Sequence, residues 1–273
     1  MSSSNEASRS VVKTMQLLEA LAHLPEAGVT ELSRQLGMHK STTYRFLNSL
    51  CELKYVYRDA ETERYRTTLK LFELGSAVVQ RIELWREANP IMEELAHETE
   101  ETVHLAMLED DKLVYLHKIE STQTLRVSMM SRIGHTAPLH CTGLGKCLLA
   151  FSPVQLSERI IERYPLTRFT ETTITSQSEL RAELERIRDR GYAVDNEEHE
   201  IGIRCVAAPI HPPASGSPAA LSLSVPSVRL TEAEIARHAR LVRAATERIE
   251  EQLNHKPDPR AAGRAGSRPT LLS

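Results

Sequence analysis

The chain has 273 residues, of which 41% are hydrophobic, 26% are charged and only 4% are aromatic. This composition is typical of one or two globular domains, and it excludes intrinsically disordered, collagen-like and disulfide-rich proteins. The unbroken apolar runs, such as residues 147–151, are far shorter than the roughly 18 residues that a membrane span needs. The polar first residues lack the apolar segment of a signal peptide. We therefore expect a cytoplasmic protein.

The chain has four cysteines, Cys51, Cys141, Cys147 and Cys205. They have neither the short paired spacing of a zinc site nor the density of a secreted scaffold, so we expect reduced thiols. The formal net charge of −3 argues against a uniformly basic surface that binds nucleic acid. However, residues 34–58 contain five Lys or Arg residues and a single acidic residue, Glu52. This segment is locally basic.

Apolar residues at helical spacing predict three helices in the first part of the chain, at residues 10–23, 31–36 and 40–53. We expect Thr30 to cap the second helix and Gly37 to end it. Two short helices joined by a glycine-containing turn are typical of the helix-turn-helix unit, whose second helix enters the major groove of DNA. The alternative is a small helical hairpin without a role in DNA binding.

The outer face of the predicted 40–53 helix favours DNA recognition over a plain hairpin. It begins with hydrogen-bond donors instead of the mixture of Glu and Lys that covers a merely solvated face. These donors are Lys40, Ser41, Thr42, Thr43 and Arg45. We expect them to contact DNA together with Arg34, which precedes the turn.

A β-hairpin is predicted next, because residues 55–58 and 64–67 alternate like strands around a polar turn. Following a helix-turn-helix unit, this hairpin would be a wing. We expect Arg58 and Arg64 to reach DNA phosphates, whereas three acidic residues at the tip argue against deep insertion into a groove.

A further helix is predicted at residues 68–81, with Leu71, Leu74 and Val78 on one line. This apolar stripe is more than a small winged helix needs for its own core. The helix is either a connector packed on the next domain or the seam of a dimer. The two-fold symmetry of many DNA sites favours the seam.

The rest of the chain contains predicted helices and strands in irregular order, which predicts an α+β domain. Helices are expected at residues 84–100, 145–151, 153–163, 178–190 and 231–253, and strands at residues 102–108, 113–119, 205–210 and 219–225. Residues 256–273 are rich in Pro, Gly, Ala and Arg, and we expect a disordered tail.

Gly143-Leu-Gly-Lys146 opens a predicted helix, where backbone N–H groups can bind an anion. The segment is not a phosphate-binding P-loop, because that motif requires Gly where His140 stands and Ser or Thr where Cys147 stands. A carboxylate site and an ordinary glycine-rich helix start remain open as alternatives.

Residues 195–205 gather acidic residues, His199 and Cys205, a set that could hold a metal ion or provide a Cys205 nucleophile with His199 as its base. Their spacing, even with His140, Cys141 and Cys147 added, does not match known metal ligands. Cys205 also opens an apolar run typical of a buried strand. We therefore expect neither a metal site nor catalysis. An enzyme that acts on a small organic acid and uses the helix-turn-helix as a DNA tether is the alternative.

Ser222 and Ser224 alternate with apolar residues, so their hydroxyls face one side of a predicted strand. Hydroxyls in this position either satisfy neighbouring backbone groups or line a polar pocket.

In this order, the motifs resemble the IclR family of bacterial transcription factors over about residues 9–254. The resemblance rests on Thr30-Glu-Leu-Ser33, Lys40-Ser-Thr-Thr-Tyr-Arg45, Gly143-Leu-Gly-Lys146, Asp195-Asn-Glu-Glu-His199 and Gly202-Ile-Arg-Cys-Val-Ala-Ala208. It implies a winged helix-turn-helix domain (1–67), a linker helix (68–83) and a GAF-like effector-binding domain (84–255). It also implies a homodimer or a dimer of dimers that binds double-stranded operator DNA.

Within the family, motifs such as Val114-Tyr-Leu-His-Lys118 and Ser131-Arg-Ile-Gly134 most resemble the repressors of 2-keto-3-deoxygluconate and pectin catabolism. The implied effector is a 2-keto sugar acid such as 2-keto-3-deoxygluconate, and no cofactor is implied. The implied pocket residues are Gly143, Leu144, Asp195, Cys205, Ser222 and Ser224. Helix-start amides and the serines would hold the carboxylate, and Asp195 would accept hydrogen bonds from effector hydroxyls. The Pro-rich loop at residues 212–218 departs from the family pattern.

Overall fold

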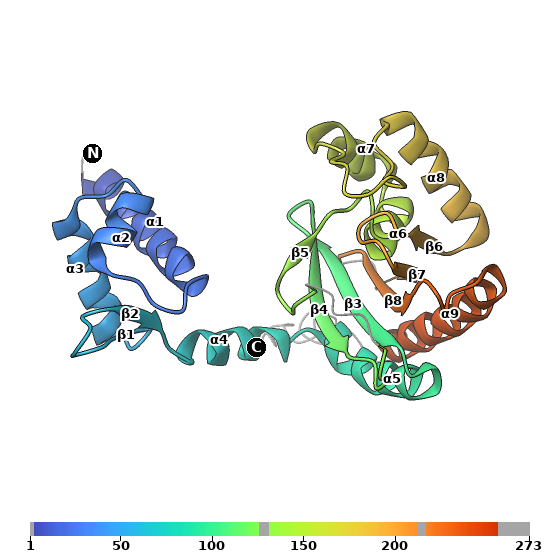
Figure 1. Cartoon of the computed structure of the whole chain (residues 1–273), viewed down its shortest axis with the longest axis horizontal. Coiled ribbons are helices and arrows are strands. Elements are labelled where there is room, and N and C mark those ends of the chain that lie inside the picture. Colours follow the sequence, from blue (N-terminus) through green and yellow to red (C-terminus); the bar gives the residue numbers. More distant parts are fainter. Residues whose placement is uncertain (1–2, 126–130, 212–216, 256–273) are drawn as a thin grey trace, which may run out of the picture. The chain divides into compact units, whose positions relative to one another are not determined.

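The computed structural model describes residues 3–125, 131–211 and 217–255. The chain divides into two compact units, Met1–Arg81 and Ile82–Ser273 (Figure 1). The expected disordered tail and residues 212–216 of the Pro-rich loop lie outside the described residues. No helix in the described ranges has the length and apolar character of a membrane span.

The first unit combines helices with a small β-hairpin. Its elements are α1 (Ser3–Ala22), α2 (Val29–Gln35), α3 (Lys40–Glu52), β1 (Val56–Arg58), β2 (Tyr65–Thr67) and α4 (Lys70–Val79). The apolar face of α3, with Phe46 and Leu47, shares a core with Leu17 and Leu21 of α1 and with Tyr65 of the hairpin. These helices and the hairpin confirm the predicted winged helix-turn-helix.

The start of α2 differs from the expectation. The helix begins at Val29, so Gly28 and not Thr30 occupies the capping position. The Gly28 N–H donates a hydrogen bond to the Glu31 carboxylate at 3.4 Å. This contact between the capping residue and the third residue of the helix stabilises a start at Val29. Thr30 therefore lies inside the first turn and does not cap the helix.

The second unit is a six-stranded antiparallel sheet with helices on both faces (Figure 1). Its helices are α5 (Glu83–Thr99), α6 (Gly143–Phe151), α7 (Val154–Arg163), α8 (Gln177–Arg190) and α9 (Glu232–Asn254). Its strands, in sheet order, are β5 (Thr136–Ala137), β4 (Lys112–Ile119), β3 (Thr102–Glu109), β8 (Ala219–Pro226), β7 (Ile203–Ile210) and β6 (Ala193–Asn196). This arrangement confirms the predicted α+β fold.

The two faces of the sheet carry different side chains. On β8, Leu221, Leu223 and Val225 join the core shared with α5 and α9. The intervening residues Ala220 and Ser222 have small side chains on the opposite face, as the two-residue period of a strand requires. Small side chains allow α6 to lie close to the sheet, and this close approach shapes the candidate site.

Two strands, β5 and β6, differ from the expectation. β5 has two residues, too few to show alternation. β6 contains Asp195 and Asn196, which belong to a polar motif in the sequence, and it pairs with β7 so that Asp195 lies opposite Cys205. Tertiary pairing thus overrides the weak strand propensity of Asp and Asn.

Candidate DNA-binding surface and effector pocket

The first turns of α3 present the polar side chains expected to contact DNA. Lys40, Ser41 and Arg45 are exposed and Thr42 is half-buried. The Arg45 guanidinium lies 5.5 Å from the Phe46 ring centroid, so its stem is supported by the core residue beside it. The start of a helix also carries a partial positive charge, which suits an approach to phosphates.

Thr43 was expected to contact DNA, but the structure places it in the core. Its side chain is fully buried, and its hydroxyl donates a hydrogen bond to the His39 carbonyl at 3.2 Å. Because Thr43 precedes Phe46 by three residues and Leu47 by four, the helical period places all three on the core side of α3. Thr43 therefore stabilises the first turn of α3 and cannot reach DNA.

The wing arginines differ in their partners. Arg58 pairs with Glu63 at 2.6 Å on the exposed side of the hairpin, and its guanidinium lies 5.8 Å from the Tyr44 ring of α3. Arg64 pairs with Glu26 at 2.7 Å and with Glu31 at 3.2 Å. Arg64 therefore ties the hairpin to the start of α2, and a phosphate would have to compete with two carboxylates for it.

A small cavity lies between the start of α6 and the sheet. It brings together five of the six expected pocket residues, Gly143, Leu144, Asp195, Cys205 and Ser224. Its volume of about 20 Å³ is room for roughly one water molecule. An organic acid can therefore enter only if the surrounding segments move apart.

Ser222 is the expected pocket residue that does not line this cavity. It is buried on β8, in register with His104 on one side and Ala207 on the other. Ser222 shares a sheet face with Ser224, as the alternation predicted, but it lies one pleat further along the strand. Periodicity fixes the face of a residue and not its distance from a cavity.

The start of α6 is held by its own cap. The Thr142 hydroxyl accepts a hydrogen bond from the Gly145 N–H at 3.0 Å and donates one to the Pro138 carbonyl at 2.7 Å. A Cβ atom on Gly143 would lie 3.2 Å from the Cys205 Cβ, so glycine lets the helix start approach β7. The first N–H groups of a helix have no partner within its backbone, and Gly143 and Leu144, the first two residues of α6, line the cavity.

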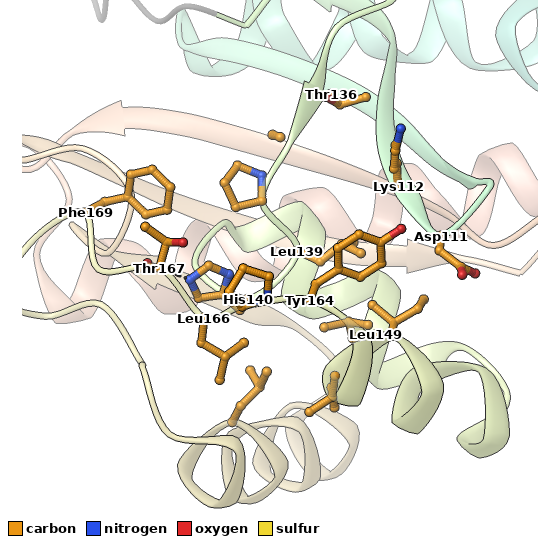
Figure 2. Close-up of a pocket in the computed structure, with 16 residues that line it drawn as sticks. Asp111, Lys112, Thr136, Leu139, His140, Leu149, Tyr164, Leu166, Thr167 and Phe169 are labelled. Carbon is orange, nitrogen blue, oxygen red and sulfur yellow. Dashed lines mark hydrogen bonds between the residues drawn. The ribbon is translucent and has the colours of Figure 1, made fainter.

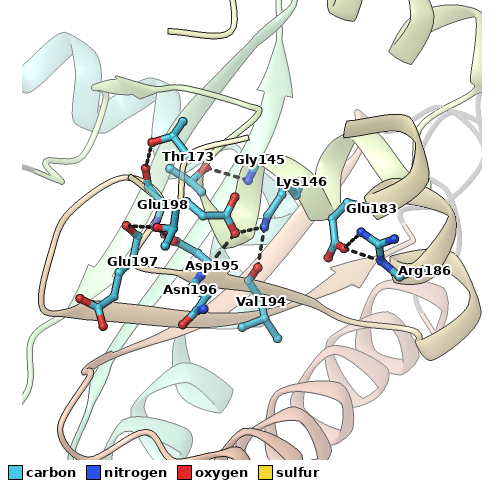
Figure 3. A network of polar contacts seen from close by, with 12 residues as sticks. Gly145, Lys146, Thr173, Glu183, Arg186, Val194, Asp195, Asn196, Glu197 and Glu198 are labelled. Carbon is cyan, nitrogen blue, oxygen red and sulfur yellow. Dashed lines mark hydrogen bonds and ion pairs between the residues drawn. The ribbon is translucent and has the colours of Figure 1, made fainter. Parts of the chain in front are cut away.

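Asp195 belongs to a buried polar network beneath the cavity (Figure 3). It is 3% exposed and accepts a hydrogen bond from the Glu198 N–H at 2.8 Å. The buried Lys146 ammonium pairs with Glu198 and donates to the Val194 carbonyl at 2.6 Å. Burial raises the pKa of Asp195 to about 7, although nearby Lys146 opposes this shift. Near neutral pH the carboxyl can therefore be protonated, which removes its repulsion of an anionic ligand.

His104, Tyr115 and His199 also line the cavity, although none of them is among the expected pocket residues. His104 lies within 3.3 Å of the Ser224 hydroxyl and 2.8 Å of the Ser131 hydroxyl. Burial lowers the pKa of His104 to about 3, so the ring is neutral. The signal for His104 in the sequence is its alternation with Ala106 on β3, which places both on the α6 side.

The cavity does not activate Cys205 as a nucleophile. Its Sγ atom lies 3.2 Å from the Ser224 hydroxyl, and burial raises the pKa of the thiol. A protonated thiol is a poor nucleophile. In the described part of the chain, no three His, Cys, Asp or Glu side chains are grouped so that they could hold a metal ion.

Comparisons with known proteins agree with these features. The IclR helix-turn-helix domain matches residues 10–60, and the C-terminal domain of the bacterial transcriptional regulator IclR matches residues 76–251. The HTH-type transcriptional regulator KdgR of Escherichia coli K12 is 42% identical over 250 residues, which cover 92% of this chain and 94% of the relative. The HTH-type transcriptional regulator XynR of the same strain is 36% identical over 84% of this chain and 90% of its own length. The crystal structure of Thermotoga maritima IclR has 33% identity and a TM-score of 0.76, and covers 90% of this chain and 99% of that one.

Proposed function

The chain belongs to the IclR family of bacterial transcriptional regulators and is a ligand-responsive DNA-binding regulator, and on this premise we propose that it represses a sugar-acid catabolic operon in the cytoplasm. In this proposal, residues 1–67 bind operator DNA, residues 68–83 form a linker helix and residues 84–255 bind the effector. The similarity to KdgR supports a 2-keto sugar acid, with 2-keto-3-deoxygluconate as the first candidate.

The start of α3 would read the operator. Lys40, Ser41, Thr42 and Arg45 lie together at its exposed or half-exposed N-terminal turns. Arg45 has the length and the paired donors to contact a guanine edge. Arg34 and Arg58 would contact phosphates and position the helix without reading sequence.

A homodimer would bring two α3 helices to adjacent half-sites. Support comes from α4, none of whose residues is buried in the single chain. Leu74 and Val78, four residues apart on one face of this helix, are 46% and 63% exposed. An apolar helix face of this kind is stabilised when a second copy covers it.

One observation carries the effector site: the α6 start, the buried Asp195 and the Ser224 hydroxyl line the same cavity. A carboxylate would accept hydrogen bonds from the first amides of α6, and a protonated or ionised Asp195 would bind effector hydroxyls. Because the cavity has room for only about one water molecule, the ligand would stabilise a more open arrangement of the domain. It would shift the regulator only by its difference in affinity for the two arrangements.

The test is calorimetry with 2-keto-3-deoxygluconate, followed by selection of the operator from random-sequence DNA and measurement of its affinity with and without the acid. Saturable binding of the acid supports the effector site. Absence of binding contradicts it. Nuclear magnetic resonance of the incubated mixture separates this proposal from the enzyme alternative, because a regulator returns the acid unchanged.

A further inference from the structure

A second and much larger cavity lies in the same unit, among α6, α7, α8 and the β5 edge of the sheet (Figure 2). Its volume of about 360 Å³ is in the range of sites for small organic molecules. Among the described residues, none lines both this cavity and the candidate effector pocket. It is therefore a separate site.

The lining of this cavity suits an uncharged ring. Its apolar side chains include Leu139, Leu149, Ile160, Ile161, Leu166 and Leu180. Asp111 at its edge is paired with Arg159 at 2.6 Å and with Arg163 at 3.3 Å. Lys112 is exposed at the rim. An anion placed against the apolar floor would lose its hydration without gaining a buried cation.

Two polar side chains in the lining, His140 and Tyr164, can orient a ligand by hydrogen bonding. The His140 Nε2 atom donates a hydrogen bond to the Thr167 carbonyl at 2.9 Å, and burial lowers the pKa of His140. A neutral imidazole that donates from Nε2 has an acceptor at Nδ1. The phenol of Tyr164 stands on the opposite side of the cavity from Phe169 (Figure 2). A ligand hydroxyl can donate to His140 while its ring lies on the leucines.

Phe169 connects the two cavities. Its ring centroid lies 6.1 Å from that of His140, which lines the large cavity, and 5.0 Å from that of His199, which lines the effector pocket. A molecule that shifts Phe169 from one side therefore changes the wall on the other side.

We propose that the large cavity is a second ligand site, which binds a small neutral phenol and is coupled through Phe169 to the effector pocket. The coupling rests on the proposed effector site, whereas the binding of the phenol does not.

The binding is tested by calorimetry of the full chain with 4-methylphenol. We expect one saturable site, with affinity reduced at least tenfold in Leu166→Trp, whose indole fills the cavity. Leu156→Trp is the matched control, because Leu156 is also half-buried in the same core but does not line the cavity. Lack of saturation, or equal affinity in Leu166→Trp, overturns the proposal.

A second variant keeps the test decisive if Leu166→Trp does not fold. His140→Phe retains an aromatic ring but lacks the acceptor, so it should weaken 4-methylphenol about fivefold, as expected for one hydrogen bond, and leave toluene unaffected. Equal losses for both compounds overturn the assigned ligand class.

The coupling is tested by repeating the titration with saturating 2-keto-3-deoxygluconate. We expect the Kd of 4-methylphenol to change at least threefold, with a reciprocal change for the acid, and Phe169→Leu to abolish the change but retain both ligands. An unchanged Kd overturns the coupling. Binding of 4-methylphenol without any binding of the acid refutes the effector site and the coupling but supports the second site.

Discussion

Lys146 and Glu198, 52 residues apart in the chain, form a buried ion pair beneath the effector pocket. The pair joins α6 to the segment that follows β6, and the ammonium also binds the Val194 carbonyl. It therefore fixes the distance between the helix start and Asp195, which are two parts of the candidate effector pocket.

Lys146→Met should lower the free energy of unfolding by about 3–5 kcal/mol, because it leaves the Glu198 charge buried without a partner. Urea unfolding measures the loss. Lys112→Met, at an exposed lysine, is the control and should have little effect. Adding Glu198→Leu to Lys146→Met should recover much of the loss, and no recovery would show that the pair is not the cause.

Asp195→Asn should flatten the pH dependence of stability. Above the ordinary Asp pKa of about 3.9 the unfolded chain releases its proton, whereas folded Asp195 keeps it until about pH 7. Wild-type stability should therefore fall between these pH values, while the uncharged variant escapes this loss. Measured by urea unfolding, the free energy of unfolding of the variant relative to wild type should therefore be higher at pH 8 than at pH 5. Asp189→Asn, at an exposed residue, is the control. An equal gain in that variant would contradict the assignment of the pH dependence to Asp195.

Arg45→Ala should weaken operator binding by about 1–3 kcal/mol if the guanidinium reads a base edge. Fluorescence anisotropy with operator and with random DNA measures this loss. An equal loss on both would make Arg45 a phosphate contact. Arg237→Ala, on α9 of the other unit, is the matched control and should bind like wild type.

Leu74→Asp combined with Val78→Asp should convert the proposed dimer to a monomer, because both exposed apolar side chains would become charged. Light scattering at micromolar concentration measures the mass. Glu73→Gln on the same helix should remain dimeric. A wild-type mass equal to that of a single chain would contradict the proposed dimer contact through α4.

The sequence predicted the elements with strong periodicity and failed where tertiary contacts decide. The amphipathic pattern of α3 predicted the helix, but Thr43 was expected among the DNA contacts because its side chain is polar, although its spacing from Phe46 and Leu47 places it on the core side. β6 was not predicted, because Asp195 is unfavourable in an isolated strand and is tolerated only beside Lys146 and the Glu198 amide. The second cavity is formed by residues distant in the sequence, which no local pattern brings together.

In the proposed mechanism, a keto acid in the effector pocket controls the affinity for operator DNA. Fluorescence anisotropy of the selected operator, with and without saturating 2-keto-3-deoxygluconate, tests it most directly. We predict a rise in the operator Kd of about 5- to 150-fold, the range of typical coupling between two sites. An operator Kd that stays the same while calorimetry shows the acid bound would contradict the claim.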